Sequence, residues 1–222
     1  MKKYNKLVVA GCSVSDRGNV DFCYGDKLAE MLDCEYDHQG AGCGSNFRIW
    51  RTITTKIRLG EIDKNTLIVI QYTCVNRKEF WTSNFIDGVQ IVHGINLRDE
   101  YDDGELIRFK SGSHEWQWSK SDSEFFKLVE NEHTNAEYDA EIFVNNHYNF
   151  IHMLQSHDFN YIFLDAWNYV HHRGYHVPSD TTIVKINSDN FDSKFNQDLF
   201  HFNNEGHIEV AKRIYNAVKI YK

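Results

Sequence analysis

Three side chains in this sequence have the types and the order needed to activate a serine hydroxyl. Ser13 follows a short apolar run in the segment GCSVS, and Asp198 and His201 lie close together in the segment DLFH near the other end. A serine hydroxyl is a weak nucleophile until a base takes its proton, and histidine suits that task near neutral pH. An aspartate that accepts from the imidazole fixes its tautomer and stabilises its charged form. These residues therefore predict acyl transfer through a Ser–His–Asp triad.

The negative oxygen that develops during acyl transfer needs hydrogen-bond donors. The backbone N–H of Ser13 is one candidate. The glycine-rich segment QGAGCGSN, at residues 39–46, offers the N–H of Gly44 and the side-chain amide of Asn46. These groups can act together only if the fold brings their segments side by side.

Short apolar runs alternate with amphipathic segments over most of the chain. We expect strands at 6–10, 34–38, 66–71, 161–166 and 182–185, and helices at 24–32, from near Ser45 to 57, at 140–155 and at 204–221. The run TLIVIQ is almost wholly apolar, which is typical of a central parallel strand covered on both faces. The alternation predicts a three-layer α/β/α sandwich with a central parallel sheet.

The candidate residues follow different strands of this predicted sheet. Ser13 follows the first strand, residues 42–46 the second and residues 73–79 the third, while residues 165–176 follow the fourth. Ligands of open α/β sheets bind beyond the carboxyl ends of the strands. We therefore expect these segments to line one edge, together with residues 197–207 before the last helix.

Residues 80–140 interrupt the alternation. They contain several aromatic residues, an acidic group at 99–105 and the run HEWQWS. We interpret them as an insertion within a single domain that spans residues 1–222. The aromatic side chains of Trp81, Phe85, Trp116 and Trp118 could stack on a sugar, or could equally form a small core of the insertion.

The charge, the cysteine content and the apolar runs of the sequence indicate which partners and which compartment to expect. The net charge of −8 argues against a nucleic-acid-binding face, which would be basic, and is compatible with neutral substrates such as sugars. The five cysteines contain no CxxC pair, so we expect neither a disulfide framework nor a zinc ribbon. The N-terminal apolar run is too short for a signal peptide, and no run suits a membrane span. We expect a cytoplasmic protein that binds no membrane and needs no cofactor or metal.

The motifs and their order resemble the SGNH (GDSL-like) hydrolase superfamily. The first block of that family, Gly-Asp-Ser-x-Ser, appears as GCSVS, the second contributes a glycine that matches Gly44, and the last, Asp-x-x-His, appears as DLFH. The resemblance covers the chain outside the insertion and implies a flavodoxin-like fold. It also implies Ser13 as the nucleophile, His201 as the base and Asp198 as its partner.

The sequence departs from this family at two places. Cys12 stands where the first block has aspartate, and the third block, Gly-x-Asn-Asp, is absent after TLIVIQ. Thr73, Asn76 or Arg77, from the segment YTCVNRKE that stands there, could replace the missing asparagine donor. The variant pattern resembles a divergent branch found in bacteriophage and bacterial proteins, so a virion location is expected if a phage encodes the chain.

The hypothesis that follows is a serine esterase that cleaves small acyl esters, such as O-acetyl groups, on a small molecule or a glycan. One alternative is a catalytically silent binding or structural protein of the same fold, for example in a virion, as the missing asparagine would suggest. Another is an acyltransferase that passes the same acyl group to an acceptor other than water. The sequence contains nothing that specifies the acyl group.

Several other residues could bind a metal, form an ion pair or act as nucleophiles, but their spacing is less characteristic. His171, His172 and His176 fit no metal-binding spacing, and the acidic group at 99–105 lacks the spaced ligands of a calcium loop, so solvated loops are the better interpretation of both. Arg77 and Glu79 could form an ion pair that orders their loop. Cys12 and Cys43 are rival nucleophiles near the predicted site, although cysteines at such positions more often serve as small packing residues.

Overall fold

The structure of the chain is a computed structural model. It describes residues 3–16, 20–42, 44–73, 140–165, 183–186, 192–196 and 201–220, and only the backbone at 78–86, 89–97, 110–111, 114–115, 136–139, 193 and 220. Statements about contacts, burial and absences below concern these residues.

A five-stranded parallel sheet forms the centre of the molecule, in the order β2-β1-β3-β8-β9. The strands are β1 (Lys6–Gly11), β2 (Glu35–Gly40), β3 (Thr66–Tyr72), β8 (Asn160–Asp165) and β9 (Ile183–Lys185). After β2 the chain crosses over β1 to form β3 on its other side, so the strand order reverses at β1. Ligands of such sheets bind at this reversal point, beyond the carboxyl ends of the strands.

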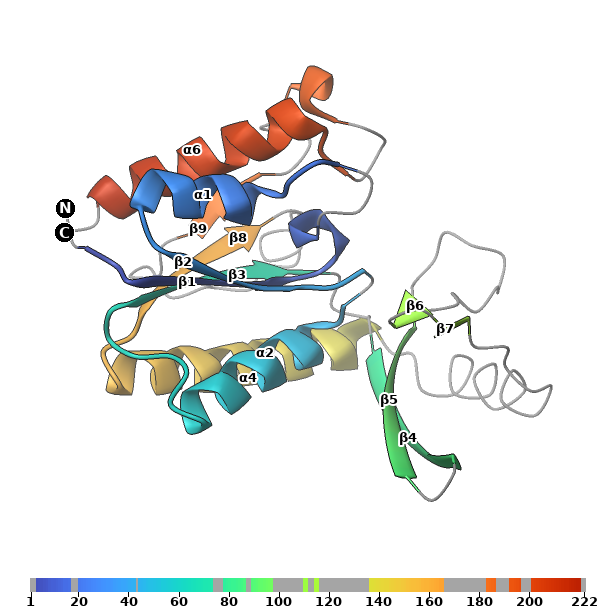
Figure 1. Cartoon of the computed structure of the whole chain (residues 1–222). Coiled ribbons are helices and arrows are strands. Elements are labelled where there is room, and N and C mark those ends of the chain that lie inside the picture. Colours follow the sequence, from blue (N-terminus) through green and yellow to red (C-terminus); the bar gives the residue numbers. More distant parts are fainter. Residues whose placement is uncertain are drawn as a thin grey trace.

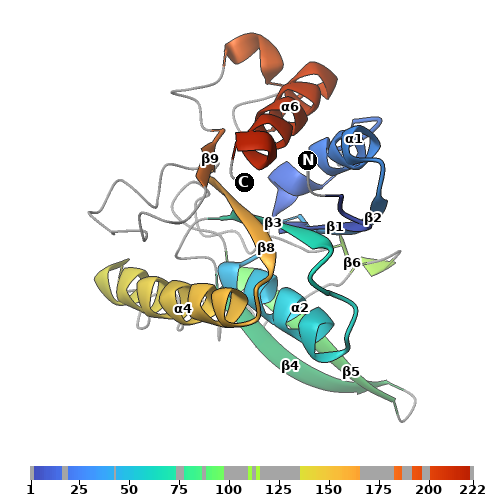
Figure 2. The same ribbon diagram turned by 90° about the vertical axis from the view of Figure 1, so that its left-hand side faces the viewer.

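Helices cover both faces of the sheet, which confirms the predicted three-layer sandwich. Figures 1 and 2 show α1 (Tyr24–Leu32) and α6 (Asn204–Ile220) on one face and α2 (Asn46–Arg58) and α4 (Ala136–Ser156) on the other. Because successive residues of a strand point to opposite faces, each central strand supplies two cores. Val9 and Val69 pack with α1 and α6, whereas Val8 and Ile68 pack with α2.

The predicted elements agree with the observed ones to within a few residues. Ser45 caps α2 as expected, since its side chain accepts from the N–H of Arg48 at 3.1 Å. The largest difference is α4, which begins at Ala136 rather than at 140. The apolar periodicity reveals the buried part of a helix but not a polar first turn. Phe47, an apolar residue in the first turn of α2, is 44 % exposed.

Within the segment expected as an insertion, the strands that the structure describes pair with one another and not with the central sheet. β4 (Lys78–Ile86) and β5 (Val89–Leu97) form an antiparallel hairpin, and the short β6 (Lys110–Ser111) pairs with β7 (His114–Glu115). Figure 1 shows the hairpin projecting away from the sandwich. The assignment of residues 1–222 to one domain stays a prediction. Among the described helices, none has the length and apolar character needed to cross a bilayer.

Candidate active site

Ser13 and His201 lie in direct contact, although 188 residues separate them in the sequence. Ser13 begins the short 3₁₀ helix η1 (Ser13–Ser15) at the end of β1, and its Oγ is 3.0 Å from Nε2 of His201. Both side chains are half-buried. This distance lies within the range over which a histidine can take a hydroxyl proton.

The neighbours of His201 hold it at this place. Phe202 is buried in the core between the sheet, α1 and α6. Asn203 caps α6, because its side-chain oxygen accepts from the N–H of Gly206 at 2.9 Å. Its amide nitrogen donates to the carbonyl of Lys194 at 2.7 Å. The backbone on the carboxyl side of His201 is therefore anchored both in the core and at a helix end.

Nε2 of His201 must lack a proton to accept one from Ser13, so Nδ1 must carry the proton and donate it to an acceptor. Asp198 is the predicted acceptor. It lies outside the described residues, as does Arg77, so the roles of both stay predictions.

We name the backbone around Ser13, residues 11–16, the Ser13 turn. Gln71 of the neighbouring strand β3 binds this turn through hydrogen bonds. The side-chain oxygen of Gln71 accepts from the Cys12 N–H at 3.0 Å, the Cys12 thiol at 3.2 Å and the Ser15 hydroxyl at 3.0 Å. The Ser15 hydroxyl also lies 2.5 Å from the hydroxyl of Tyr24 on α1. A buried polar group is costly unless it is hydrogen-bonded, and here each is.

The glycine-rich segment lies directly against the Ser13 turn. The N–H of Ala41 donates to the carbonyl of Gly11 at 3.2 Å, and the N–H of Gly44 donates to the carbonyl of Ala41 at 3.0 Å. A side chain at Gly44 would meet the carbonyl oxygens of both Gly11 and Ala41 at 3.2 Å. The structure thus brings Gly44 against the Ser13 turn, and its N–H donates within its own loop. Its role as an oxyanion donor stays a prediction.

Asn46 joins the glycine-rich segment to the end of β3. Its amide nitrogen donates to the carbonyl of Thr73 at 3.0 Å, and its oxygen accepts from the N–H of Thr73 at 2.9 Å. Both residues are buried. This exchange places Asn46 and Thr73 at the edge that holds Ser13, where they support the loops. A direct contact of Asn46 or Thr73 with an oxyanion stays a prediction.

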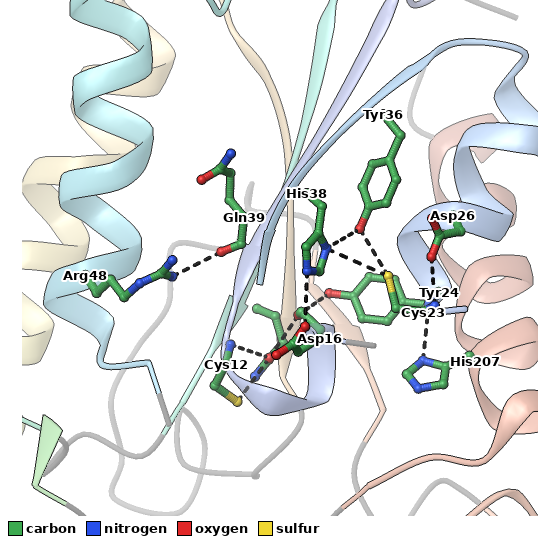
Figure 3. Close-up of polar contacts among 12 residues, drawn as sticks. Cys12, Asp16, Cys23, Tyr24, Asp26, Tyr36, His38, Gln39, Arg48 and His207 are labelled. Atoms are coloured by element: carbon green, nitrogen blue, oxygen red, sulfur yellow. Dashed lines mark hydrogen bonds and ion pairs between the residues drawn. The ribbon is translucent and has the colours of Figure 1, made fainter. Parts of the chain in front are cut away.

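A charged cluster that the sequence did not indicate lies on the outer side of the Ser13 turn (Figure 3). His38 of β2 contacts Asp16 through Nε2 at 3.3 Å and the Tyr36 hydroxyl through Nδ1 at 2.8 Å. The Tyr36 hydroxyl in turn lies 3.1 Å from Sγ of Cys23. The hydrogen bond to Asp16 is the main reason that the pKa of His38 is raised to about 9. His38 is therefore protonated at neutral pH.

His207 behaves in the opposite way to His38. Its Nδ1 accepts from the backbone N–H of Tyr24 at 3.1 Å, which ties α6 to the start of α1. Burial lowers the pKa of His207 to about 4, so the ring is neutral at pH 7. This contact joins residues that are 183 positions apart, so local sequence does not indicate it.

Solved structures with a similar arrangement of strands and helices include a protein of the G-D-S-L type, a lipase and an acetylxylan esterase. A protein assigned to the G-D-S-L lipolytic family of Desulfitobacterium hafniense aligns over 96 % of this chain and 99 % of its own, with a TM-score of 0.52 and 11 % identity. A lipase from a goat rumen metagenome aligns over 96 % of both chains, with a TM-score of 0.51 and 12 % identity. The chain has the fold of the SGNH hydrolases.

A third solved structure of this fold is a catalytic mutant of an acetylxylan esterase from Geobacillus stearothermophilus. It aligns over 98 % of this chain and 96 % of its own, with a TM-score of 0.50 and 9 % identity. No protein-family model and no curated protein matches the sequence. The SGNH assignment thus concerns the fold, and the chemistry must be argued from the site.

Within the SGNH fold, several other candidates fall outside the described residues. These are Cys43, Asn76, the histidines of the segment HHRGYH, the acidic group at 99–105, and the side chains of Glu79, Trp81, Phe85, Trp116 and Trp118. Among the residues that are described, no three His, Cys, Asp or Glu side chains gather closely enough to hold a metal ion.

Proposed function

We propose that the chain is a serine esterase that hydrolyses small acyl esters through an acyl-enzyme on Ser13. The observation that carries this proposal is the 3.0 Å contact between Ser13 Oγ and His201 Nε2. Two polar side chains that are 188 residues apart meet at the edge where open α/β sheets hold their ligands. The esterases among the solved structures of this fold add support.

The reaction follows from the positions of these two side chains. Ser13 Oγ attacks the ester carbonyl carbon while His201 Nε2 takes the hydroxyl proton, and the carbonyl oxygen becomes an oxyanion. The bond from carbon to the alcohol oxygen then breaks, and His201 returns the proton to that oxygen. Water attacks the acyl-enzyme next, with His201 taking its proton, and the carboxylic acid leaves as Ser13 regains a proton.

An orienting carboxylate and a set of oxyanion donors complete this mechanism. Asp198 orients the imidazole of His201 and stabilises its charged form. The N–H of Ser13 serves as an oxyanion donor, because the first residue of a helix keeps its N–H outside the helix's own hydrogen bonds. Gly44 and Asn46 are the next donors in the proposal, through movements that release the N–H of Gly44 from Ala41.

The substrate class we propose is an O-acetyl ester, on a small molecule or a glycan. The acetylxylan esterase among the solved structures of this fold supports an acetyl group. In this proposal the alcohol portion of the ester lies near the start of the insertion, because the insertion follows β3, whose carboxyl end adjoins the site.

The experiment that tests this function is labelling with a fluorophosphonate probe, read by intact mass. Wild-type protein should gain one adduct, and Ser13→Ala should gain none while remaining folded. Wild-type protein should also release acetate from p-nitrophenyl acetate and from acetylated xylo-oligosaccharides. A folded wild-type protein that gains no adduct would overturn the proposal.

The second candidate function is a catalytically silent binding protein of the same fold, in the cytoplasm or on a virion. Two observations favour this alternative. The N–H of Gly44, an expected oxyanion donor, donates to the carbonyl of Ala41 instead, and the asparagine of the third block is absent from the sequence. Binding of acetylated glycans without acetate release would support this alternative. Acyl transfer to an added sugar alcohol, in preference to water, would instead identify a transferase.

A further inference from the structure

A buried glutamine underlies the Ser13 turn. Gln71 is the sixth residue of β3, TLIVIQY, whose other members before it are apolar apart from Thr66 at its start. Gln71 is fully buried, with 0 % of its surface exposed. A glutamine amide in this place lowers stability unless both its oxygen and its nitrogen are hydrogen-bonded. The hydrogen-bond partners of Gln71 therefore indicate why β3 has a glutamine at this position.

The contacts of Gln71 determine how its amide is oriented. The backbone N–H of Cys12 can only donate, so the atom that faces it at 3.0 Å must be the amide oxygen. The amide nitrogen then donates to the carbonyl of Tyr72. With the oxygen so placed, the Ser15 hydroxyl donates to it, and the Tyr24 hydroxyl donates to Ser15. A relay of donors thus runs from α1 through the turn to β3.

These contacts hold the Ser13 turn on both sides of Ser13 itself. Cys12 precedes Ser13, and Ser15 follows it by two residues, yet both donate to one oxygen. Gly11 completes the fit, because a side chain there would collide with Ser15 Oγ and lie only 2.8 Å from the Gln71 oxygen. Figure 3 shows Cys12, whose nitrogen and sulfur both take part. The peptide between Cys12 and Ser13, which carries the N–H of Ser13, therefore has little freedom.

We propose that Gln71 is a positioning residue for catalysis by Ser13. It holds the Ser13 hydroxyl against His201 and aims the Ser13 N–H at the developing oxyanion, without touching the reacting atoms. The catalytic part of this inference rests on the proposed esterase function. A displacement of about 1 Å at a reacting group can cost about 10²-fold in rate. Loss of the Gln71 oxygen should therefore lower kcat rather than weaken substrate binding.

The first test compares Gln71→Met with Thr66→Val, using p-nitrophenyl acetate. Both changes remove a buried hydrogen-bonding group from β3, but Thr66 lies at the far end of the strand, where it pairs with Asp63. We expect Gln71→Met to lower kcat about 10²-fold with KM changed less than about 2-fold, and Thr66→Val to leave both unchanged. A folded Gln71→Met protein with wild-type kcat would overturn the inference.

A conservative variant adds a readout that a purely structural role would not produce. In Gln71→Glu the acceptor oxygen is kept, but an ionised carboxylate would face the Tyr72 carbonyl, whereas the protonated acid can donate to it. Burial raises the pKa of such a carboxyl, so the activity of Gln71→Glu relative to wild type should rise from about pH 8 to about pH 6. A relative activity that is flat over this range would contradict the positioning role. Ser15→Ala, which removes one donor, should cause a smaller loss than Gln71→Met.

A measurement that needs no activity separates this inference from the proposed function. In full-length protein with ¹⁵N-labelled histidine, the Nε2 signal of His201 can be identified by its loss in His201→Asn. We expect Gln71→Met to shift this signal, because the contact with Ser13 changes, and Thr66→Val to leave it in place. If wild-type protein proves inert toward probe and esters, the function fails, but the shift still decides the role of Gln71. An unshifted signal in Gln71→Met would overturn it.

Discussion

The Ser13 turn is held from two sides by contacts of different kinds. On the inner side, Gln71 and Tyr24 are fully buried and neutral, and they hold the turn through hydrogen bonds alone. On the outer side, the ion pair of Asp16 and His38 is partly open to solvent, with 36 % and 27 % of these side chains exposed. Neutral buried contacts depend on shape, whereas exposed charged contacts depend on pH and salt. The two sides should therefore respond differently to mutation and to solution conditions.

The largest effect is expected from Gly11→Ala, which places a methyl group in the inner side. Because it would collide with Ser15 and approach the Gln71 oxygen, we expect the free energy of unfolding to fall by about 1–3 kcal/mol. Esterase activity should fall with it. The matched control is Gly42→Ala, where an added methyl meets nothing within 4 Å, and which should change stability by less than about 1 kcal/mol. Urea denaturation measures both. Equal effects would show that the inner side tolerates repacking.

A smaller difference is expected between two tyrosines that lose their hydroxyls. Tyr24→Phe deprives the buried Ser15 hydroxyl of a partner and should lower the free energy of unfolding by about 1–2 kcal/mol. Tyr36→Phe removes a hydroxyl from the half-buried outer side, where His38 can still pair with Asp16, and should cost about half as much. Thermal unfolding at neutral pH distinguishes the two. A larger loss for Tyr36→Phe would reverse the ranking of the two sides.

The smallest effect is expected from His38→Gln, and it should depend on pH. The pKa of His38 is raised to about 9 in the folded protein, mainly by Asp16, against its ordinary value of 6.5. Protonated His38 therefore stabilises the fold fully below about pH 6.5, and this contribution disappears as the pH rises through 9. Wild-type protein should exceed His38→Gln in stability by about 1 kcal/mol or less at pH 6, and match it near pH 10.

Asp16→Asn supplies the control for the last experiment, since it removes the carboxylate that raises the pKa of His38. It should abolish most of the pH-dependent difference while leaving His38 in place. A difference between wild-type protein and His38→Gln that grows above pH 9 would contradict the assignment of a stabilising ion pair.

The fold could be predicted closely because its central strands are buried on both faces. The run 66–71 is nearly continuous in apolar residues, and the observed strand differs from it by one residue. The start of α4 could not be located, since its first turn, AEYD, contributes little to the apolar stripe. The hairpin of β4 and β5 was not predicted, although the sequence contains signals for it. Val89, Ile91, Ile95 and Leu97 alternate along β5, and the dipeptide Asp87-Gly88 is typical of hairpin turns.

The candidate site could be predicted only in part, for a different physical reason. Ser13 and His201 have local motifs, and the structure brings their side chains together. Gln71 could be recognised as a lone amide at the end of an apolar strand, but its partner could not. That partner follows from the pairing of β3 with β1, a long-range event that local sequence does not specify. His38 was expected within a strand, and its ion pair with Asp16 likewise depends on how β2 meets the Ser13 turn.

The contact between Ser13 and His201 also has a consequence for the order of events as the chain is made. Synthesis releases β1 early, but the imidazole arrives only with the segment that leads into α6, which packs beside α1. A contact that spans 188 residues closes late, after many local contacts have formed. An unfinished chain on the ribosome, although it already carries the serine, lacks the group that would activate it. In the proposed mechanism, Ser13 therefore becomes an activated nucleophile only after α6 has packed beside α1.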